Sequence, residues 1–491
     1  MTQVTVTTVN GTNVSFEEKD PMQGGLKDVY FTTDRRHVVA FYRNPLDYTG
    51  VERLEKLVTT YRQGIFEREG GDFWKDYYCW PEEIIKYNNK VGLMVPVYQP
   101  CFFFGKDTNL DGAEKEGKWF ASAKNFNRFV PANDKGTLLS YLRISLNLSR
   151  AVRRLHAAGL AHSDLSYRNC LVDPATGNAC IIDIDGLVVP GLFPPDVIGT
   201  PDFIAPEVVA TMSLPRHDPQ RKLPCRETDQ HALAVLIYLY LFHRHPLRGS
   251  KVHSQDNATQ ELLEMGEKAL FIENPRDQSN RFKVKHNDQD FLPWVDTDKL
   301  PYTIMGPYLK ALFDRAFIDG LHSPNERPIA DEWEKDLVKT LDLIQPCENP
   351  SCPKGWYVFQ NTSSPMCPYC GTKFKGQLPV LDLYSTRDGS KFMSDNHRLM
   401  VYNNQYIRPW HVDRNIFPDE KLLDHQKAPV GYFSFHKKRW LFVNQRLDGL
   451  KDLNQNKDVP IGQAVELTDG LRLLLKPGPG GRLVNVTLVK A

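Results

Sequence analysis

The feature that most constrains the fold of this 491-residue chain is a series of three short motifs in a fixed order. His-Ser-Asp-Leu-Ser-Tyr-Arg-Asn occupies residues 162–169, an apolar run ends in Ile-Asp-Ile-Asp-Gly at 182–186, and Ala-Pro-Glu occupies 205–207. The first motif follows a helical pattern and precedes a strand-like one, so we expect it to lie on a loop. One such motif alone would be a weak signal, whereas three in sequence constrain the chain strongly.

These motifs carry the groups that phosphoryl transfer needs. Mg²⁺ on a triphosphate takes hard oxygen ligands, and the side chains of Asn169 and Asp183 can supply them from two points of a site. Asp164, five residues before Asn169, can orient an attacking hydroxyl group and accept its proton. His162 would brace the loop. The alternative is that Asp164 and Asp183 are ordinary loop and strand-end carboxylates.

The three motifs resemble those of the protein kinase superfamily, whose catalytic loop reads His-Arg-Asp-Leu-x-x-x-Asn and is followed by Asp-Phe-Gly and Ala-Pro-Glu. The resemblance covers about residues 24–344 and implies a bilobal kinase-like fold that uses ATP and Mg²⁺. It implies that Asp229 braces the catalytic loop and that Arg327 pairs with Glu207. Asp183 is preferred as the metal ligand of the second motif, and Asp185, at the glycine position, is an additional candidate ligand for Mg²⁺.

The lysine expected on the third strand is missing from residues 38–43, although a cation beside the phosphates is a strong electrostatic requirement. Arg43 is one residue past the expected position. Lys27 lies in a segment that resembles the glycine loop of the with-no-lysine kinases, where a lysine reaches the phosphates; the alternative is a solvated hairpin charge. Glu55 is preferred to Glu52 as the acidic partner on the first helix. The expected nucleotide-binding set is Gly24, Gly25, Lys27, Val29, Ala40, Arg43 and Glu55, with Lys27 also catalytic.

Two other departures bear on regulation and specificity. Ser163 replaces the arginine that receives a phosphorylated activation loop in the family, so control by loop phosphorylation is not expected. Ser166 and Arg168 do not settle which hydroxyl group is phosphorylated, and Ser or Thr is favoured by analogy with divergent bacterial kinases. An active kinase is preferred to a nucleotide-binding pseudokinase that acts as a scaffold, and phosphorylation of a small molecule is disfavoured.

Four of the nine cysteines are clustered. Two pairs of thiols in tight turns suit tetrahedral Zn²⁺, and the pattern resembles a structural zinc ribbon. The alternative is a pair of disulfides, which is disfavoured because the other cysteines are scattered without a pairing pattern. The expected zinc ligands are Cys347, Cys352, Cys367 and Cys370.

The residues after the cysteine cluster have the pattern of short strands separated by Gly, Pro, Asn and Asp turns. They resemble the later strands of a forkhead-associated β-sandwich, without its phosphothreonine-reading signature, and a plain sandwich for protein contacts is the alternative. The expected organisation is a multidomain α+β protein: a kinase-like domain at 1–345 (small lobe about 15–98, large lobe about 99–345), a zinc ribbon at 346–376 and a β-sandwich at 377–491.

The charge and hydropathy of the chain limit the classes of binding partner that we expect. A formal net charge of +1 favours neither nucleic acid nor a membrane surface, and the longest apolar run, residues 232–242, is about half of a membrane span. The polar N-terminus does not resemble a signal peptide, so a cytoplasmic protein is expected. The order of domains and the segment 191–207 resemble the bacterial kinases of the tellurite-resistance-associated group, which implies a protein substrate, a partner phosphatase and a von Willebrand A-type partner in a stress or signalling pathway.

Overall fold

The computed structural model describes most of the chain, namely residues 3–19, 21–23, 25–67, 70–106, 108–189, 192–193, 195, 198–215, 217–282, 293–360 and 363–490. Gly24 of the expected nucleotide-binding set lies outside the described residues, as do Gly191, Pro194, Asp196 and Val197 of the 191–207 segment. The chain forms two compact units. Unit 1 comprises Met1–Gly136, Arg143–Asp298 and Leu312–Glu334, and unit 2 comprises Thr137–Leu142, Lys299–Ala311 and Lys335–Ala491.

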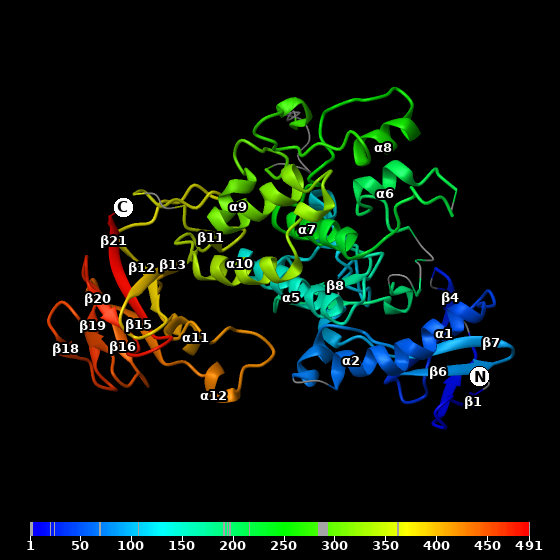
Figure 1. Ribbon diagram of the computed structural model, residues 1–491, viewed down its shortest axis with the longest axis horizontal. Coiled ribbons are helices and arrows are strands. Elements are labelled where there is room, and N and C mark those ends of the chain that lie inside the picture. The colour runs from blue at the N-terminus through cyan, green and yellow to red at the C-terminus, as the bar shows by residue number, and fades with distance from the viewer. Residues whose placement is uncertain are drawn as a thin grey trace. The chain divides into compact units, whose positions relative to one another are not determined.

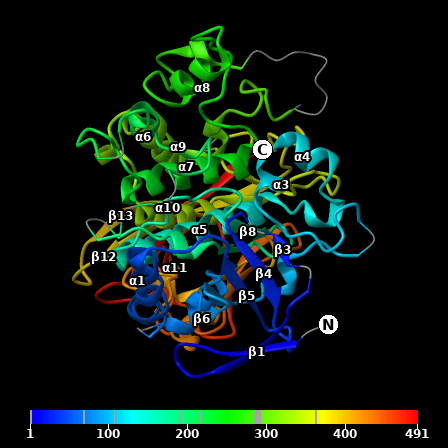
Figure 2. The same ribbon diagram turned by 90° about the vertical axis from the view of Figure 1, so that its right-hand side faces the viewer.

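The first part of unit 1 contains a five-stranded antiparallel sheet of strand order β3-β4-β5-β7-β6 (Figure 1). Phe16, Val39 and Phe41 fill its core, since alternate residues of β5 point to opposite faces. Figure 2 shows β3, β4 and β5 side by side, and in the register Lys27 is the direct partner of Tyr42. The five strands are β3 (Met22–Gln23), β4 (Lys27–Phe31), β5 (His37–Tyr42), β6 (Glu83–Tyr87) and β7 (Lys90–Pro96). They are preceded by a separate two-stranded sheet of β1 (Gln3–Thr7) and β2 (Asn13–Glu17).

A helical segment connects β5 to β6. α1 (Tyr48–Lys56) begins at Asp47, whose side chain accepts a hydrogen bond from the N–H of Gly50 at 2.7 Å. The segment continues through a π-helical stretch, Leu57–Tyr61, into α2 (Arg62–Phe66). Leu54 and Leu57 are buried, which agrees with the helical spacing of the sequence. The expected single helix is therefore a continuous run with a π-helical centre.

The helical part of unit 1 is organised around α7, in which every residue from Thr228 to Phe242 is buried. This explains the apolar run at 232–242 as a core helix, and no helix among the described residues has the length and apolar character to cross a bilayer. A short hairpin of β8 and β9 follows α5. The elements are α3 (Lys118–Ala121), α4 (Ala123–Arg128), α5 (Leu138–Ala157), β8 (Cys170–Asp173), β9 (Asn178–Ile181), α6 (Pro206–Thr211), α7 (Arg226–Phe242), α8 (Asn257–Met265), α9 (Gly306–Asp314) and α10 (Ala330–Asp342), of which α5, α9 and α10 also have residues in unit 2.

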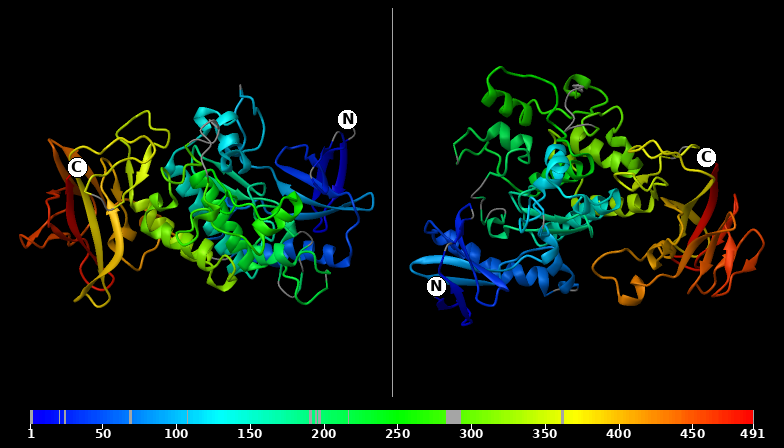
Figure 3. Two further views of the ribbon diagram at one scale, coloured as in Figure 1. Left: turned by 90° about the horizontal axis from the view of Figure 1, so that it is seen from above. Right: turned by 180° about the vertical axis from the view of Figure 1, so that it is seen from behind.

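Unit 2 contains two antiparallel sheets that share one hydrophobic core, to which Leu381, Phe433, Phe442 and Val484 contribute. The first has the order β13-β12-β21-β20-β17-β18 and the second β14-β15-β16-β19, drawn in yellow to red in Figure 3. The elements are β10 (Ile344–Pro346), β11 (Trp356–Val358), β12 (Gln377–Thr386), β13 (Phe392–Met400), β14 (Tyr406–Ile407), α11 (Pro409–Val412), α12 (Asp424–Lys427), β15 (Gly431–His436), β16 (Arg439–Asn444), β17 (Lys451–Asp452), β18 (Lys457–Asp458), β19 (Ala464–Glu466), β20 (Arg472–Leu474) and β21 (Arg482–Lys490).

Candidate active site

The loop of the first motif is held by a buried carboxylate. Asp229, near the start of α7, accepts hydrogen bonds from the backbone N–H groups of His162 at 2.7 Å and Ser163 at 3.1 Å. The imidazole Nε2 of His162 lies 3.0 Å from the carbonyl oxygen of Ile182, which connects the loop to the chain just before Asp183. Asp229 thus contacts the backbone of the loop, and His162 connects the loop to the segment that precedes Asp183.

Asp164 lies at the centre of this loop and is fixed from two sides. Thr200 donates from its N–H at 2.6 Å and from its hydroxyl group at 2.7 Å to Asp164 Oδ1. The amide Nδ2 of Asn169 donates to the carbonyl oxygen of Asp164 at 2.8 Å and to Oδ2 at 3.0 Å. Because Asn169 directs its N–H atoms toward Asp164, its amide oxygen is the atom left for a metal ion. Thr200 was not predicted from the sequence.

Lys27 lies between the carboxylates of Asp183 and Asp185. Its Nζ is 2.6 and 2.7 Å from the two oxygens of Asp185 and 3.2 Å from Asp183 Oδ1. The side chains of Lys27 and Asp185 are 17% and 12% exposed, whereas that of Asp183 is 55% exposed. Asp183 has a φ of 57°, a left-handed conformation that is uncommon for a residue other than glycine, although Asp adopts it more readily than most.

The electrostatics of this group follow from the contact between ammonium and carboxylate. Burial alone would lower the pKa of Lys27, but the charges of Asp185 and Asp183 raise it above its usual value. Burial would likewise raise the pKa of Asp185, but the charge and hydrogen bonds of Lys27 lower it to about 2. Asp185 is therefore ionised at neutral pH, as a metal ligand must be.

Tyr42 completes the group, and the sequence reasoning missed it. Its hydroxyl group donates to Asp185 Oδ2, and Lys27 Nζ lies 5.4 Å from the centre of its ring. Burial, followed by the negative charge of Asp185, raises the pKa of Tyr42 well above its usual value, so that it is a neutral donor. The signal was available, because Tyr42 occupies the position in Val-Ala-Phe-Tyr at which the kinase pattern has its lysine.

Arg43, the alternative candidate for the cation beside the phosphates, does not lie at this site. The guanidinium group of Arg43 donates to Asp28 Oδ1 at 2.9 Å and to the carbonyl oxygens of Gly25 and Lys27, and it does not join the carboxylates of Asp183 and Asp185. The strand turns it outward because it follows Tyr42 directly.

On the first helix, Glu55 is exposed, and Glu52 forms an ion pair with Lys56 at 3.1 Å. The charged residue of α1 that enters the core is Arg53, which is 6% exposed and whose charge acts to lower the pKa of Tyr42. The structure therefore does not bring the preferred acidic partner Glu55 to Lys27. Farther along β4 and β5, Val29 and Ala40 are direct partners, and Ala40 is buried.

Glu207 of the third motif forms a buried ion pair with Arg327, which lies between α9 and α10. The guanidinium group of Arg327 donates to both carboxylate oxygens of Glu207, at 2.8 and 2.7 Å, and its side chain is 1% exposed. It also donates to the carbonyl oxygens of Gly320, Glu227 and Leu321. This is the pairing that the resemblance implied.

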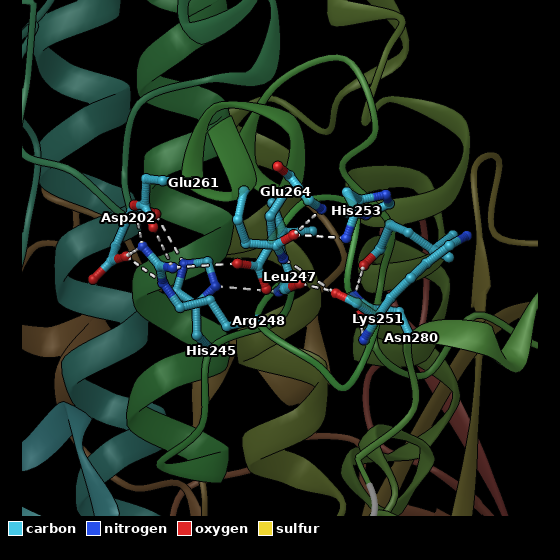
Figure 4. Close-up of polar contacts among 12 residues, drawn as sticks. Asp202, His245, Leu247, Arg248, Lys251, His253, Glu261, Glu264 and Asn280 are labelled. Atoms are coloured by element: carbon cyan, nitrogen blue, oxygen red, sulfur yellow. Dashed lines mark hydrogen bonds and ion pairs between the residues drawn. The ribbon is translucent and has the colours of Figure 1, made fainter. Parts of the chain in front are cut away.

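The chain between Thr200 and the third motif is held by a polar network that the sequence did not reveal (Figure 4). Arg248 donates to Asp202 at 2.6 Å and to both carboxylate oxygens of Glu261, at 2.8 and 2.5 Å. His245 Nε2 donates to the carbonyl oxygen of Asp202 at 2.9 Å, while its Nδ1 accepts from the N–H of Leu247. Burial lowers the pKa of His245 to about 4, which keeps the imidazole neutral.

In unit 2 the four clustered cysteines meet, with one sulfur atom from each within 4.8 Å of the others. Sγ of Cys347 is 3.5 Å from that of Cys370, and Sγ of Cys352 is 3.7 Å from that of Cys367. Although burial opposes it, hydrogen bonds from Thr372 lower the pKa of Cys370 to about 6. Four thiols at this separation match the tetrahedral donor set that Zn²⁺ prefers.

The comparison with models of protein families agrees with this geometry. Residues 124–305 match the family model of the protein kinase domain, a range that contains Asp164, Asn169 and Asp183 but not Lys27 or Tyr42. Among solved structures, the kinase domain of a Toxoplasma gondii specific rhoptry antigen is similar, with 13% sequence identity and a TM-score of 0.40 over 69% of this chain and 86% of that chain. No curated protein matches. Over residues 124–305, this chain therefore matches a protein kinase domain.

Proposed function

We propose that the chain is an active protein kinase that transfers the γ-phosphate of ATP to Ser or Thr hydroxyl groups of a protein. The observation that carries the proposal is the convergence of Asp183, Asp185 and Lys27 beside a catalytic loop in which Asp164 and Asn169 are fixed. Phosphoryl transfer depends mainly on positioning and on electrostatic stabilisation, and this set provides both. The choice of Ser or Thr rests on analogy with divergent bacterial kinases.

Each residue has a defined role in this proposal. Asp164 accepts the hydrogen bond of the substrate hydroxyl group and orients its oxygen toward the γ-phosphate, and Thr200 holds the carboxylate in place. The oxygen donors of Asp183, Asp185 and Asn169 fit Mg²⁺, which would neutralise the phosphate charge when bound. Lys27 supplies the ammonium group that binds the phosphate oxygens of ATP. Tyr42 orients Asp185 through its hydrogen bond.

A nucleotide-binding pseudokinase that acts as a scaffold is the second candidate. The observation that favours it is the replacement of the third-strand lysine by Tyr42, a neutral residue. The active kinase is preferred because the hydroxyl-orienting carboxylate and the candidate metal ligands are retained, and because Lys27 lies directly opposite Tyr42.

The experiment that separates the two measures phosphate transfer from γ-labelled ATP to a mixed protein substrate and to the chain itself. Asp164→Asn should lower the transfer rate by about 10²- to 10⁴-fold, the usual contribution of a general base, while ATP binding is kept. Asp72→Asn, a matched change at a side chain that is 93% exposed, should leave transfer unchanged. ATP binding without transfer in the wild type, or equal transfer by Asp164→Asn, would favour the scaffold.

We further propose roles for the remaining regions. The four cysteines form a structural zinc ribbon at 346–376, and the two sheets at 377–491 form a β-sandwich of forkhead-associated type that recruits partners. The supporting observations are the converging sulfur atoms and the shared core of the two sheets. Service in a cytoplasmic bacterial signalling pathway, with a phosphatase and a von Willebrand A-type protein as partners, is proposed from the resemblance of the sequence alone.

A further inference from the structure

The ammonium group of Lys27 occupies a position in which a metal ion would be expected. It contacts three carboxylate oxygens from two residues, with Nζ at 2.6 and 2.7 Å from Asp185 and at 3.2 Å from Asp183. Mg²⁺ binds carboxylate oxygens at about 2.0–2.1 Å, so an ion that bridges the two carboxylates would need the space that Nζ fills. Lys27 in this position and a metal ion bound to both residues exclude each other.

The local charge explains why Lys27 takes this position. Two carboxyl groups that lie close together in a partly buried site favour a cation between them. Tyr42 adds a hydrogen bond to Asp185 but no charge. Two nearby cations, Arg43 directly after β5 and Lys90 on β7, pair with Asp28 instead, at 2.9 and 3.3 Å. Lys27 therefore balances the two carboxylates.

We propose that Lys27 is a stand-in cation: it fills the metal position between Asp183 and Asp185 in the nucleotide-free protein and moves onto the phosphates when Mg²⁺ and ATP enter together. This inference rests on the proposed function. The exchange keeps charges paired throughout, because Mg²⁺ replaces the ammonium group at the carboxylates while the ammonium group gains the phosphate oxygens. Lys27 thereby opposes binding of the metal ion alone and favours binding of the metal ion with nucleotide.

This role gives Lys27 two effects of opposite sign. A lysine that only bound phosphates would affect metal binding in the absence of nucleotide only through the repulsion of its charge, which salt screens. A stand-in cation must be displaced before a metal ion can bind alone, so its removal strengthens that binding and still weakens the binding of ATP. Coupling between two ligands of this kind usually changes affinity by about 5- to 150-fold.

The test is titration of the full chain with Mn²⁺ in the absence of nucleotide. Binding is measured as the loss of the electron paramagnetic resonance signal of free Mn²⁺. Lys27→Met should tighten Mn²⁺ binding by about 5-fold or more and should weaken ATP binding in the presence of Mg²⁺. Lys27→Arg, which keeps the charge, should not tighten it. Lys90→Met is the matched control, because Lys90 is on the same sheet but pairs with Asp28, and it should leave Mn²⁺ affinity unchanged.

A second measurement uses the wild-type protein and does not depend on the folding of a variant. Acetylation of lysines by a water-soluble reagent, followed by mass spectrometry, should show faster modification of Lys27 as Mn²⁺ is added, with no change at Lys90. Unchanged or weaker Mn²⁺ binding by folded Lys27→Met would overturn the inference, as would an acetylation rate of Lys27 that does not change when Mn²⁺ is added. Failure of the wild type to bind ATP would instead count against the proposed function.

Discussion

Among single residues, Tyr42 and Lys27 show that the cation of a kinase-like site can be supplied from β4 when the usual lysine position on β5 holds a tyrosine. The two are direct partners across β4 and β5, and both contact Asp185. Direct partners in an antiparallel pair have Cβ atoms only about 4.5–5.5 Å apart. The cation can therefore come from either strand and still reach the same carboxylates.

This geometry predicts a rescue of ATP binding. In the Lys27→Met background, Tyr42→Lys should restore ATP affinity by about 1.5–3 kcal/mol, the net value of a hydrogen bond to a charged group, because the new ammonium group starts from the adjacent strand position. Tyr42→Phe in the same background is the control and should restore nothing. Isothermal titration of ATP in the presence of Mg²⁺ measures the effect, and a double variant as weak as the single one would contradict it.

The same residues show what a sequence can and cannot reveal about a site. Asp164, Asn169 and Asp183 could be chosen because their spacing along one segment is fixed by the chain itself. Thr200 could not, since it contacts a residue 36 positions away and no local pattern of residue types marks it. Tyr42 occupies the position of the missing lysine, but its contact with Asp185, 143 positions away, exists only after the chain has folded.

At the scale of elements, the end of α10 is fastened within unit 2 by two histidines. Asp342 Oδ2 lies 2.7 Å from His397 Nε2 on β13, and Asp342 Oδ1 lies 3.2 Å from His411 Nε2 on α11. His411 Nδ1 accepts from the N–H of Arg408, so its Nε2 is a donor to Asp342. The strand and helix patterns were predictable here, whereas this contact between three elements was not.

Asp342 predicts a dependence of stability on pH. Burial would raise its pKa, but the two histidines lower it well below the usual value. A carboxyl group with a lowered pKa in the folded state stabilises the fold at pH values above its unfolded pKa of about 4 and loses this effect as the pH falls below that value.

Asp342→Asn should therefore be less stable than the wild type at pH 7, by about 1.5–3 kcal/mol for hydrogen bonds to a charged group. The difference should shrink between about pH 4 and pH 3. Asp424→Asn, which removes the same charge from a fully exposed side chain, is the control. Urea unfolding followed by tryptophan fluorescence measures the difference, and an unchanged gap at pH 3 would contradict the prediction.

At the scale of the whole molecule, the compact units do not follow the order of the sequence. Unit 2 takes in Thr137–Leu142 and Lys299–Ala311 together with the chain after Glu334. α5, α9 and α10 thus each have residues in both units. Hydrophobic patterns predicted the helices and strands themselves, but grouping distant segments into a unit depends on contacts that no single segment encodes.

The cysteine cluster of unit 2 predicts about one zinc ion per chain. The double variant Cys367→Ser, Cys370→Ser should lose the metal ion and lower the thermal stability, because a segment this short gains its folding energy from the metal ion. Cys101→Ser, at a cysteine outside the cluster, is the control and should keep the zinc. Metal analysis by mass spectrometry and thermal unfolding measure the two effects, and a metal-free wild type with intact disulfides would contradict the prediction.

The start of α5 contacts Lys354, a residue of the segment that holds the clustered cysteines. The N–H of Leu138 donates to the carbonyl oxygen of Lys354 at 3.0 Å, and the buried Lys354 ammonium group lies 4.6 Å from the centre of the Tyr141 ring. α5 then leads directly into the loop of Asp164. A chain truncated just before residue 354 would keep the three motifs at 162–169, 182–186 and 205–207 but would lose the contacts of Lys354 with the helix that leads into the catalytic loop.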